Sequence, residues 1–400
     1  MALAAAAVAA TRRVTCRLLA RPHPAGPCPN WYHVTTRSIS NSSSSSDTGR
    51  GHLPPPADDL TAGLSVYYSD AFTVALPEGH RFPMERYAAT AATLRSVVAS
   101  LPPGATGRAL VLREPPRASR DALCLAHDAG YVDAFLDGSL PEAAMRDIGF
   151  PWSPAFVTRT LAITGGTLAA TADALAAWRP RGGGGVGRGI ACVAAGGTHH
   201  AWADHGEGFC VVNDIAIAAR AALAAGAETG VRRVVVLDLD VHQGNGTAAI
   251  LAADAPHAIT LSIHGARNYP WATRAPSTLD VDLPDGTGDD AYLAALTAAL
   301  ADVDARLPGP HTDVLAFFQA GVDPLAEDRL GRLALTRTGL RARNAAVYAW
   351  AEARGVPLVV TMGGGYARPI SASARAHADV FLQAAASWTR RRAAADAGLP

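Results

Sequence analysis

Five short runs in the second half of the chain are almost continuously hydrophobic. They lie at 190–193, 234–237, 258–263, 314–318 and 356–361. A strand with one solvent-exposed face alternates apolar and polar residues, whereas a strand covered on both faces does not. The runs therefore predict a parallel β-sheet with helices on each side.

The segments between these runs are rich in alanine and predict helices at 161–178, 215–225 and 291–305. Helices that alternate with short buried strands are typical of an α/β fold. From about residue 63 onward the sequence shows no second linker and no internal repeat. A glycine tract at 181–189 is too short to separate two domains, so we expect a single α/β domain.

The N-terminal segment has a different composition. Residues 1–46 contain five arginines, no acidic residue and a serine run at 42–46. This composition is typical of an organelle transit peptide, and an untargeted disordered tail is the alternative. The early arginines favour a mitochondrial address, and the Met-Ala start and the serines favour a chloroplast. A nuclear or cytosolic pool stays open as well.

Further domain boundaries follow from composition. The proline-rich stretch LPPPADD predicts a linker at 47–62. We expect the catalytic domain at 63–390 and a C-terminal tail at 391–400.

Charge and cysteine content exclude several classes of protein. Residues 51–400 carry 29 arginines against 34 acidic residues, and the chain contains no lysine. A mildly acidic body without basic runs gives no footprint for nucleic acid. No uninterrupted apolar run reaches the roughly 18–20 residues of a membrane span, so a soluble protein without a membrane partner is expected. The five scattered cysteines indicate neither a disulfide framework nor a zinc ribbon.

Polar or glycine-rich clusters follow every apolar run. In chain order the clusters contain His199 and His200; Asp238, Asp240 and His242; His264; Asp323; and Tyr366. In an open parallel sheet, ligands bind at the carboxyl ends of the strands. Five clusters at the same edge therefore predict an active-site rim.

Asp240, His242 and Asp323 offer two carboxylates and one imidazole. A catalytic zinc takes three such ligands and keeps a position open for water. In VVVLDLDVHQGNG the D-x-H spacing at a strand end can direct both side chains to one face. Fe(II) or Mn(II) would accept the same donors. The alternative is a set of capping and salt-bridge residues that bind no metal.

Two further features suit acid–base chemistry. His199 and His200 follow a Gly-Gly turn and can supply a general base, with Asp238 and Asn245 as orienting partners. Tyr366, in GGGY, can donate its phenolic O–H to a developing oxyanion. A histidine pair or a glycine-rich turn also occurs in loops without catalysis. Combined with a metal, however, these groups predict hydrolysis of an amide or ester.

Several long motifs resemble the histone deacetylase superfamily, which includes bacterial acetylpolyamine amidohydrolases. They are GGTHHAWADHGEGFCVVND, VVVLDLDVHQGNGTA, AGVDPLAEDRLGRLALT and TMGGGY, preceded by HRFPMERY and DIGFPWSP. The similarity extends from about residue 67 to 385, and HQGNG and DRLG resemble the class IV-like branch most. The resemblance implies an arginase-like, three-layer α/β/α fold with a mostly parallel sheet.

The resemblance also implies roles for individual residues. It implies one Zn²⁺ held by Asp240, His242 and Asp323. His200 becomes the general base and acid, with His199 as its electrostatic partner. Asp238 would hold His199, and Tyr366 would polarise the scissile carbonyl. Gly208, Phe209 and Tyr269 would line an acyl-lysine tunnel. A structural K⁺ is implied at Asp238, Asp240, His242, Ser262 and Ile263.

One position departs from the best-studied members of that family. Asn245 stands where many of them have aspartate, beside the second histidine. An amide cannot stabilise an imidazolium as a carboxylate does, so a less basic His200 is expected, with consequences for rate and pH optimum.

The expected function is zinc-dependent removal of acetyl or longer acyl groups from N-acyl-lysine on proteins, such as histones or organellar proteins. Small N-acetylated amines, including polyamines and arylalkylamines, are the alternative substrates. A non-catalytic reader of acyl groups is the alternative from a different functional class.

Overall fold

The computed structural model describes residues 52–102, 104–178, 189–309 and 311–397. The predicted transit segment and all but the last residue of the glycine tract lie outside the described residues. Residues 52–62, the described part of the predicted linker, contain neither helix nor strand.

One sheet of eight parallel strands forms the centre of the described part, in the order β2-β1-β3-β8-β7-β4-β5-β6. The strands are β1 (Leu64–Tyr67), β2 (Leu110–Arg113), β3 (Ile190–Val193), β4 (Arg233–Asp238), β5 (Ala258–Gly265), β6 (Leu279–Leu283), β7 (Val314–Gln319) and β8 (Leu358–Thr361). All five apolar runs are strands, and they are the five consecutive inner strands from β3 to β5. The predicted parallel sheet is thus confirmed.

The three strands without a sequence prediction lie at the two ends of the sheet. β6 reads LDVDL; its first four residues alternate between partly buried and exposed, and Leu283 is buried. β2 is only partly buried along its length. β6 alternates apolar and acidic residues, and the apolar part of β2 is short and ends at an arginine, so a search for long buried runs does not detect either strand.

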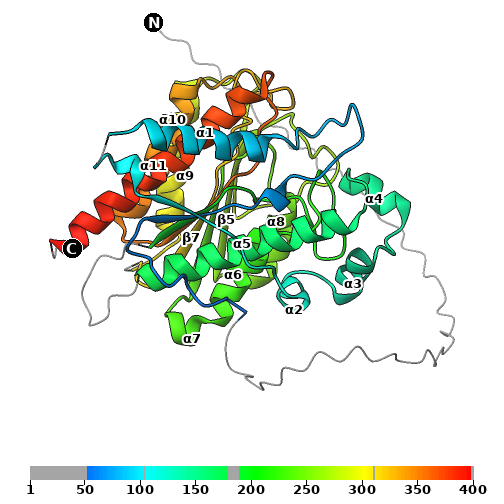
Figure 1. Cartoon of the computed structure of the whole chain (residues 1–400), viewed down its shortest axis with the longest axis horizontal. Helices are drawn as coiled ribbons and strands as arrows, with labels where there is room; N and C mark the ends of the chain where they lie inside the picture. Colours follow the sequence, from blue (N-terminus) through cyan, green and yellow to red (C-terminus); the bar gives the residue numbers. More distant parts are fainter. Residues whose placement is uncertain (1–51, 103, 179–188, 310, 398–400) are drawn as a thin grey trace, which may run out of the picture. The chain divides into compact units, whose positions relative to one another are not determined.

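Helices cover both faces of the sheet (Figure 1). One face carries α5 (Pro154–Trp178), α6 (Asp214–Ala224) and α8 (Asn245–Leu251); the other carries α9 (Asp289–Ala305), α10 (Arg337–Ala353) and α11 (Ile370–Asp396), with α1 (Arg86–Ser100) packed on α11. Shorter elements are α2 (Arg120–Leu123), α3 (Ala129–Asp137), α4 (Glu142–Ile148), α7 (Gly226–Thr229) and the 3-10 turns Asp70–Phe72, Thr106–Arg108 and Ala252–Asp254. The arrangement confirms the three-layer α/β/α fold.

The three predicted helices correspond to α5, α6 and α9. The expected tail at 391–400 differs from the structure, because α11 continues to Asp396 and buries Arg391. Among the described residues, no helix is both long and apolar enough to cross a membrane.

A fully buried arginine connects α10 to the carboxyl ends of β4 and β7. Arg343 donates hydrogen bonds to the backbone carbonyls of Leu239 (3.2 Å), Gly321 (2.5 Å) and Ala320 (3.4 Å). Leu239 directly precedes Asp240, and Gly321 lies two residues before Asp323. Buried carbonyls must be paired, so Arg343 stabilises the two strand ends that carry these aspartates.

The loop between β3 and α6 is fixed by a second set of buried contacts. Asn213 donates from its side chain to the carbonyl of Ala201 (3.2 Å) and to Thr247 Oγ1 (2.9 Å). Its backbone N–H donates to Nε2 of His127 (2.8 Å), whose Nδ1 contacts the carbonyl of Trp202 (2.8 Å). His127 must therefore be neutral, with its proton on Nδ1.

Arg343→Leu is expected to lower the free energy of unfolding by about 3 kcal/mol, because it leaves three buried carbonyls without donors. Arg341→Leu, on the exposed side of the same helix, should change it by less than about 0.5 kcal/mol. Urea denaturation of both variants measures the difference. Equal losses in the two variants would contradict the anchoring role.

Burial lowers the pKa of His127 to about 4. In the unfolded chain the pKa is about 6.5, so as the pH falls below that value the unfolded state binds a proton first. The contribution of neutral His127 to the free energy of unfolding is therefore fully present above pH 6.5 and is lost as the pH falls toward 4. At pH 5 the loss amounts to about 2 kcal/mol. In denaturation experiments, the stability gap between wild type and His127→Gln should narrow by that amount from pH 7 to pH 5. A stability difference between the two proteins that stays constant with pH would contradict the lowered pKa of His127.

Candidate functional site

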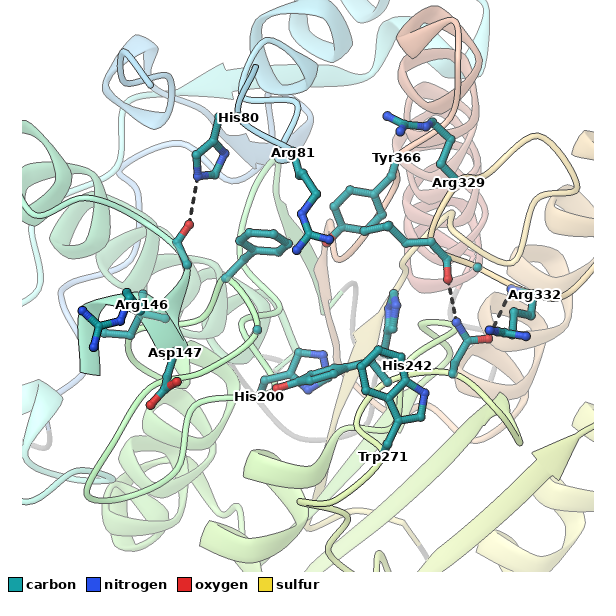
Figure 2. Close-up of a pocket in the computed structure, with 18 of the residues that line it drawn as sticks. His80, Arg81, Arg146, Asp147, His200, His242, Trp271, Arg329, Arg332 and Tyr366 are labelled. Carbon is teal, nitrogen blue, oxygen red and sulfur yellow. Dashed lines mark hydrogen bonds between the residues drawn. The ribbon is translucent and has the colours of Figure 1, made fainter. Parts of the chain in front are cut away.

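The carboxyl ends of the inner strands border a cavity of about 820 Å³. His200, His242 and Tyr366, which follow β3, β4 and β8, all line this cavity, as Figure 2 shows. Segments that are far apart in the sequence thus present polar side chains to one space. His264 does not line it; it is fully buried and contacts Ser262 Oγ through Nδ1 (2.9 Å).

Asp240, His242 and Asp323 converge in the buried floor of this region. One donor atom from each lies within 4.8 Å of the others. Nδ1 of His242 lies 2.9 Å from Asp240 Oδ1 and 3.2 Å from Asp323 Oδ2. The structure therefore brings together the three groups for which the sequence predicted a shared cation.

Backbone amides fix one oxygen of each carboxylate. Asp240 Oδ2 accepts from the N–H of Gly364 (2.7 Å), and Asp323 Oδ1 accepts from the N–H of Val241 (2.9 Å). A Cβ on Gly364 would lie 2.0 Å from Asp323 Oδ2, so the GGGY backbone requires glycine at this point. Asp323 Oδ2 is buried without a hydrogen-bond partner among the described residues.

The pKa values of Asp323 and His242 indicate that this cluster favours bound positive charge. Burial and the neighbouring Asp240 raise the pKa of Asp323 to about 7. Burial opposes a charge on His242, but the neighbouring carboxylates of Asp240 and Asp323 raise its pKa to about 10. A divalent cation would displace these protons. Two oxygen donors, one nitrogen donor and an unpaired buried oxygen fit such an ion.

The histidine doublet presents two rings with different partners. Nδ1 of His199 lies 2.7 Å from Asp238 Oδ2, and Nδ1 of His200 lies 2.7 Å from Asn245 Oδ1. Burial opposes a charge on His199, but Asp238 and Asp240 raise its pKa above the ordinary value. Burial, together with His199 and His242, holds the pKa of His200 well below it. His200 is thus a neutral ring facing the cavity.

Glu207, to which the sequence analysis gave no role, lies behind Asn245. Its Oε1 accepts from Asn245 Nδ2 (2.5 Å), and the carbonyl of Thr273 accepts from the same amide (2.8 Å). Because both partners can only accept, the amide must turn its oxygen toward His200. Nδ1 of His200 then carries the proton, and Nε2 is left free to accept one. A carboxylate between two glycines in GEGFC was the signal in the sequence.

Gly208, Phe209 and Tyr269 line the same cavity. Phe209 has φ 67°, the left-handed region, which no other non-glycine residue of the described part adopts. Its N–H donates to the carbonyl of Ile148 (2.8 Å), which ties GEGFC to DIGFPWSP. A Cβ on Gly208 would lie 2.8 Å from the His200 ring. Strained backbone of this kind is concentrated at functional sites.

Tyr366 enters the cavity from the turn after β8. Its N–H donates to Asp328 Oδ2 (2.6 Å), and its ring centroid lies 6.3 Å from that of His242. Burial raises the pKa of its hydroxyl well above the usual value. The hydroxyl therefore stays protonated and can donate a hydrogen bond.

The residues expected to bind a potassium ion lie on neighbouring strands. Ser262 pairs with Asp238 in the register of β4 and β5, and Ile263 follows it. Asp240 and His242 lie just beyond the end of β4. The presence of K⁺ at this place stays a prediction.

Comparisons with known proteins agree with this geometry. The model of the histone deacetylase domain matches residues 80–381. An uncharacterized protein of Picosynechococcus sp. is 38% identical over 308 residues, which cover 77% of this chain and 94% of that protein. A histone deacetylase-like amidohydrolase of Pseudomonas aeruginosa is 34% identical over 283 residues, 66% of this chain and 68% of that protein.

A solved structure of an HDAC homologue in complex with SAHA has the same fold. Its TM-score is 0.63 at 21% identity, with 81% of this chain and 84% of that chain covered. The domain match covers most of the described residues, including all three members of the buried Asp-His-Asp cluster. The chain therefore belongs to the histone deacetylase family of hydrolases.

Proposed function

We propose that this protein is a zinc-dependent hydrolase that removes acetyl or longer acyl groups from N-acyl-lysine side chains of proteins. The observation that carries the proposal is the convergence of Asp240, His242 and Asp323 beside a cavity that His200 and Tyr366 also line. A set of metal ligands, a neutral imidazole and a protonated phenol together suit metal-assisted hydrolysis of an amide.

Asp240, His242 and Asp323 would hold the zinc. Bound there, the ion would act as a Lewis acid, polarising the amide carbonyl and lowering the pKa of the attacking water. The donor set alone also suits Fe(II) or Mn(II); membership of the deacetylase family favours zinc.

The protein's own groups handle the protons. His200 accepts the proton of the attacking water at Nε2, since Nδ1 is committed to Asn245, and later donates it to the leaving amine. His199, held by Asp238, adds positive charge beside the developing oxyanion. Tyr366 donates its O–H to the oxygen of the scissile carbonyl.

The walls of the cavity fit a linear acyl-lysine. Phe209 and Tyr269 offer aromatic surface to an alkyl chain, and Gly208 leaves room for it. Small N-acetylated amines remain the second candidate, because the same groups would hydrolyse them. A non-catalytic reader would bind the acyl group without releasing acetate.

Targeting to an organelle remains part of the proposal. Residues 1–46 have the composition of a transit peptide. A relative from Oryza sativa, 33% identical over 178 residues, is named a chloroplastic histone deacetylase. Imaging of a fluorescent fusion of residues 1–60 tests the address and separates mitochondrion from chloroplast.

Asp240→Ala should lose both zinc and activity, because it removes one of three ligands. His200→Ala should retain zinc but lose at least about 100-fold in kcat, the usual contribution of a general base. Zinc content and acetate release from acetyl-lysine peptides, acetylated polyamines and acetylated arylalkylamines measure both effects.

His205→Ala is the matched control, since this exposed histidine contacts only Asp204 and Trp202 in the described part and should remain fully active. A metal-free wild-type protein that is indifferent to chelators would refute the proposal. So would full activity of either of the other two variants.

Glu207→Ala should lower kcat by about 10–100-fold, as loss of a group that orients a catalytic residue typically does. Glu207→Gln, which keeps an acceptor for the Asn245 amide, should lose less. Asn245→Asp alone would place two carboxylates 2.5 Å apart, whereas adding Glu207→Gln exchanges amide and carboxylate and should recover activity. Steady-state kinetics at constant zinc content test the series. If the kcat of the double variant were no higher than that of Asn245→Asp, the proposed orientation of the Asn245 amide, with its oxygen toward His200, would be wrong.

A further inference from the structure

The outer lining of the cavity is strongly basic. Arg81, Arg146, Arg329 and Arg332 line it, against a single carboxylate, that of Asp147 (Figure 2). The balance is opposite across residues 51–400 taken together, which contain more acidic than basic residues. Positive charge is therefore concentrated at this opening.

Most of this charge is not neutralised locally. Arg81 and Arg329 form no hydrogen bond or ion pair with the described part of the chain. Among the described residues, Arg146 pairs only with Glu142, at 3.6 Å from a side chain that is 96% exposed, and such pairs contribute little. Arg332 shares Asp285 with Arg267.

The chemistry of these groups narrows the ligand. Since the chain has no lysine, every fixed positive charge at the opening is a guanidinium, which stays protonated at all physiological pH values. Guanidinium groups bind carboxylates in a planar, two-point arrangement. A concave surface of one sign also concentrates the field on an approaching ligand.

The arginines lie at the opening of the cavity, and this position determines which part of the substrate they contact. The inference rests on the proposed function, which places the acyl group at the inner end of the cavity beside His242. The amine-bearing part then passes the opening. Trp271, 74% exposed and edge-on to Tyr269 at 5.6 Å, offers this part an apolar surface.

We propose that the opening selects N-acyl amides that carry a carboxylate on the amine side, in the part of the substrate that passes the opening. Arg81 and Arg329 are the residues that determine this specificity. The carboxylate belongs either to an acidic residue next to an acyl-lysine or to the α-carboxylate of a free acyl-amino acid. Acetylated polyamines and arginine-rich or lysine-rich tails are repelled at the same place.

The test compares kcat/KM of the zinc-loaded full chain on acetyl-lysine peptides that differ only in the two flanking residues: Asp, Asn or Arg. We expect kcat/KM to decrease in the order Asp, Asn, Arg. The ratio between the Asp and Arg peptides should be about tenfold at low salt and should fall as salt screens the charges. Nα-capped Nε-acetyl-lysine and its C-terminal amide form a second arm. Preference for the acid there identifies the small-molecule source, and preference only among peptides identifies the protein source.

Arg81→Gln and Arg329→Gln should each reduce the Asp-to-Arg ratio about fivefold, the upper range for an exposed ion pair. Arg306→Gln is the matched control, because Arg306 follows α9 and precedes β7, at the opposite edge of the sheet. It removes the same charge and should leave the ratio unchanged. An equal rate on Asp and Arg peptides would overturn the proposal, as would an equal effect of all three variants.

Binding separates this inference from the proposed function. If the wild-type protein turned over no substrate, the dissociation constants of the same peptides for the zinc-loaded chain would still be measured. Tighter binding of the Asp peptide would support the selective opening although the enzyme proposal had failed. Equal or absent binding would overturn the selective opening as well.

Discussion

Two carboxylates and an imidazole within 4.8 Å of one another in a buried place are the central constraint on this structure. Like charges so close raise one another's free energy, and burial adds the cost of desolvation. Burial and the nearby Asp240 therefore raise the pKa of Asp323, and the two carboxylates raise the pKa of His242 against the effect of burial. The arrangement is held only because the surrounding backbone leaves these groups no other position, and a bound cation would remove the repulsion.

The fold supplies that backbone in three ways. Parallel strands bring their carboxyl ends to one edge, so that Asp240 and Asp323 follow neighbouring strands β4 and β7. Arg343 pairs the carbonyls just before these residues. The glycines after β8 let the chain approach so closely that a backbone N–H reaches Asp240. The same close approach places Tyr366 at the cavity.

The groups proposed for acid–base chemistry and for selectivity lie outside the Asp-His-Asp cluster. The neutral amide of Asn245 lies between His200 and Glu207 and holds the imidazole in one tautomer. The Glu207 carboxylate contacts the amide and not the imidazole. The ring is thereby oriented without being held in its charged form, which agrees with its low pKa. Farther out, four arginines and a single aspartate line the cavity. Charge thus changes sign along the cavity, from a negative floor to a positive opening.

The sequence by itself determined the inner part of the fold and named residues that the structure brings together at one edge of the sheet. Continuous apolar runs identified β3, β4, β5, β7 and β8, because burial on both faces removes alternation, and the polar residues after them marked one edge of the sheet. It did not reveal β1, β2 and β6, because β6 alternates apolar and acidic residues and the apolar stretches of β1 and β2 are short. Glu207 and the unpaired arginines also emerged only from the tertiary structure. Their roles depend on which side chains of distant segments meet, and no local periodicity encodes that.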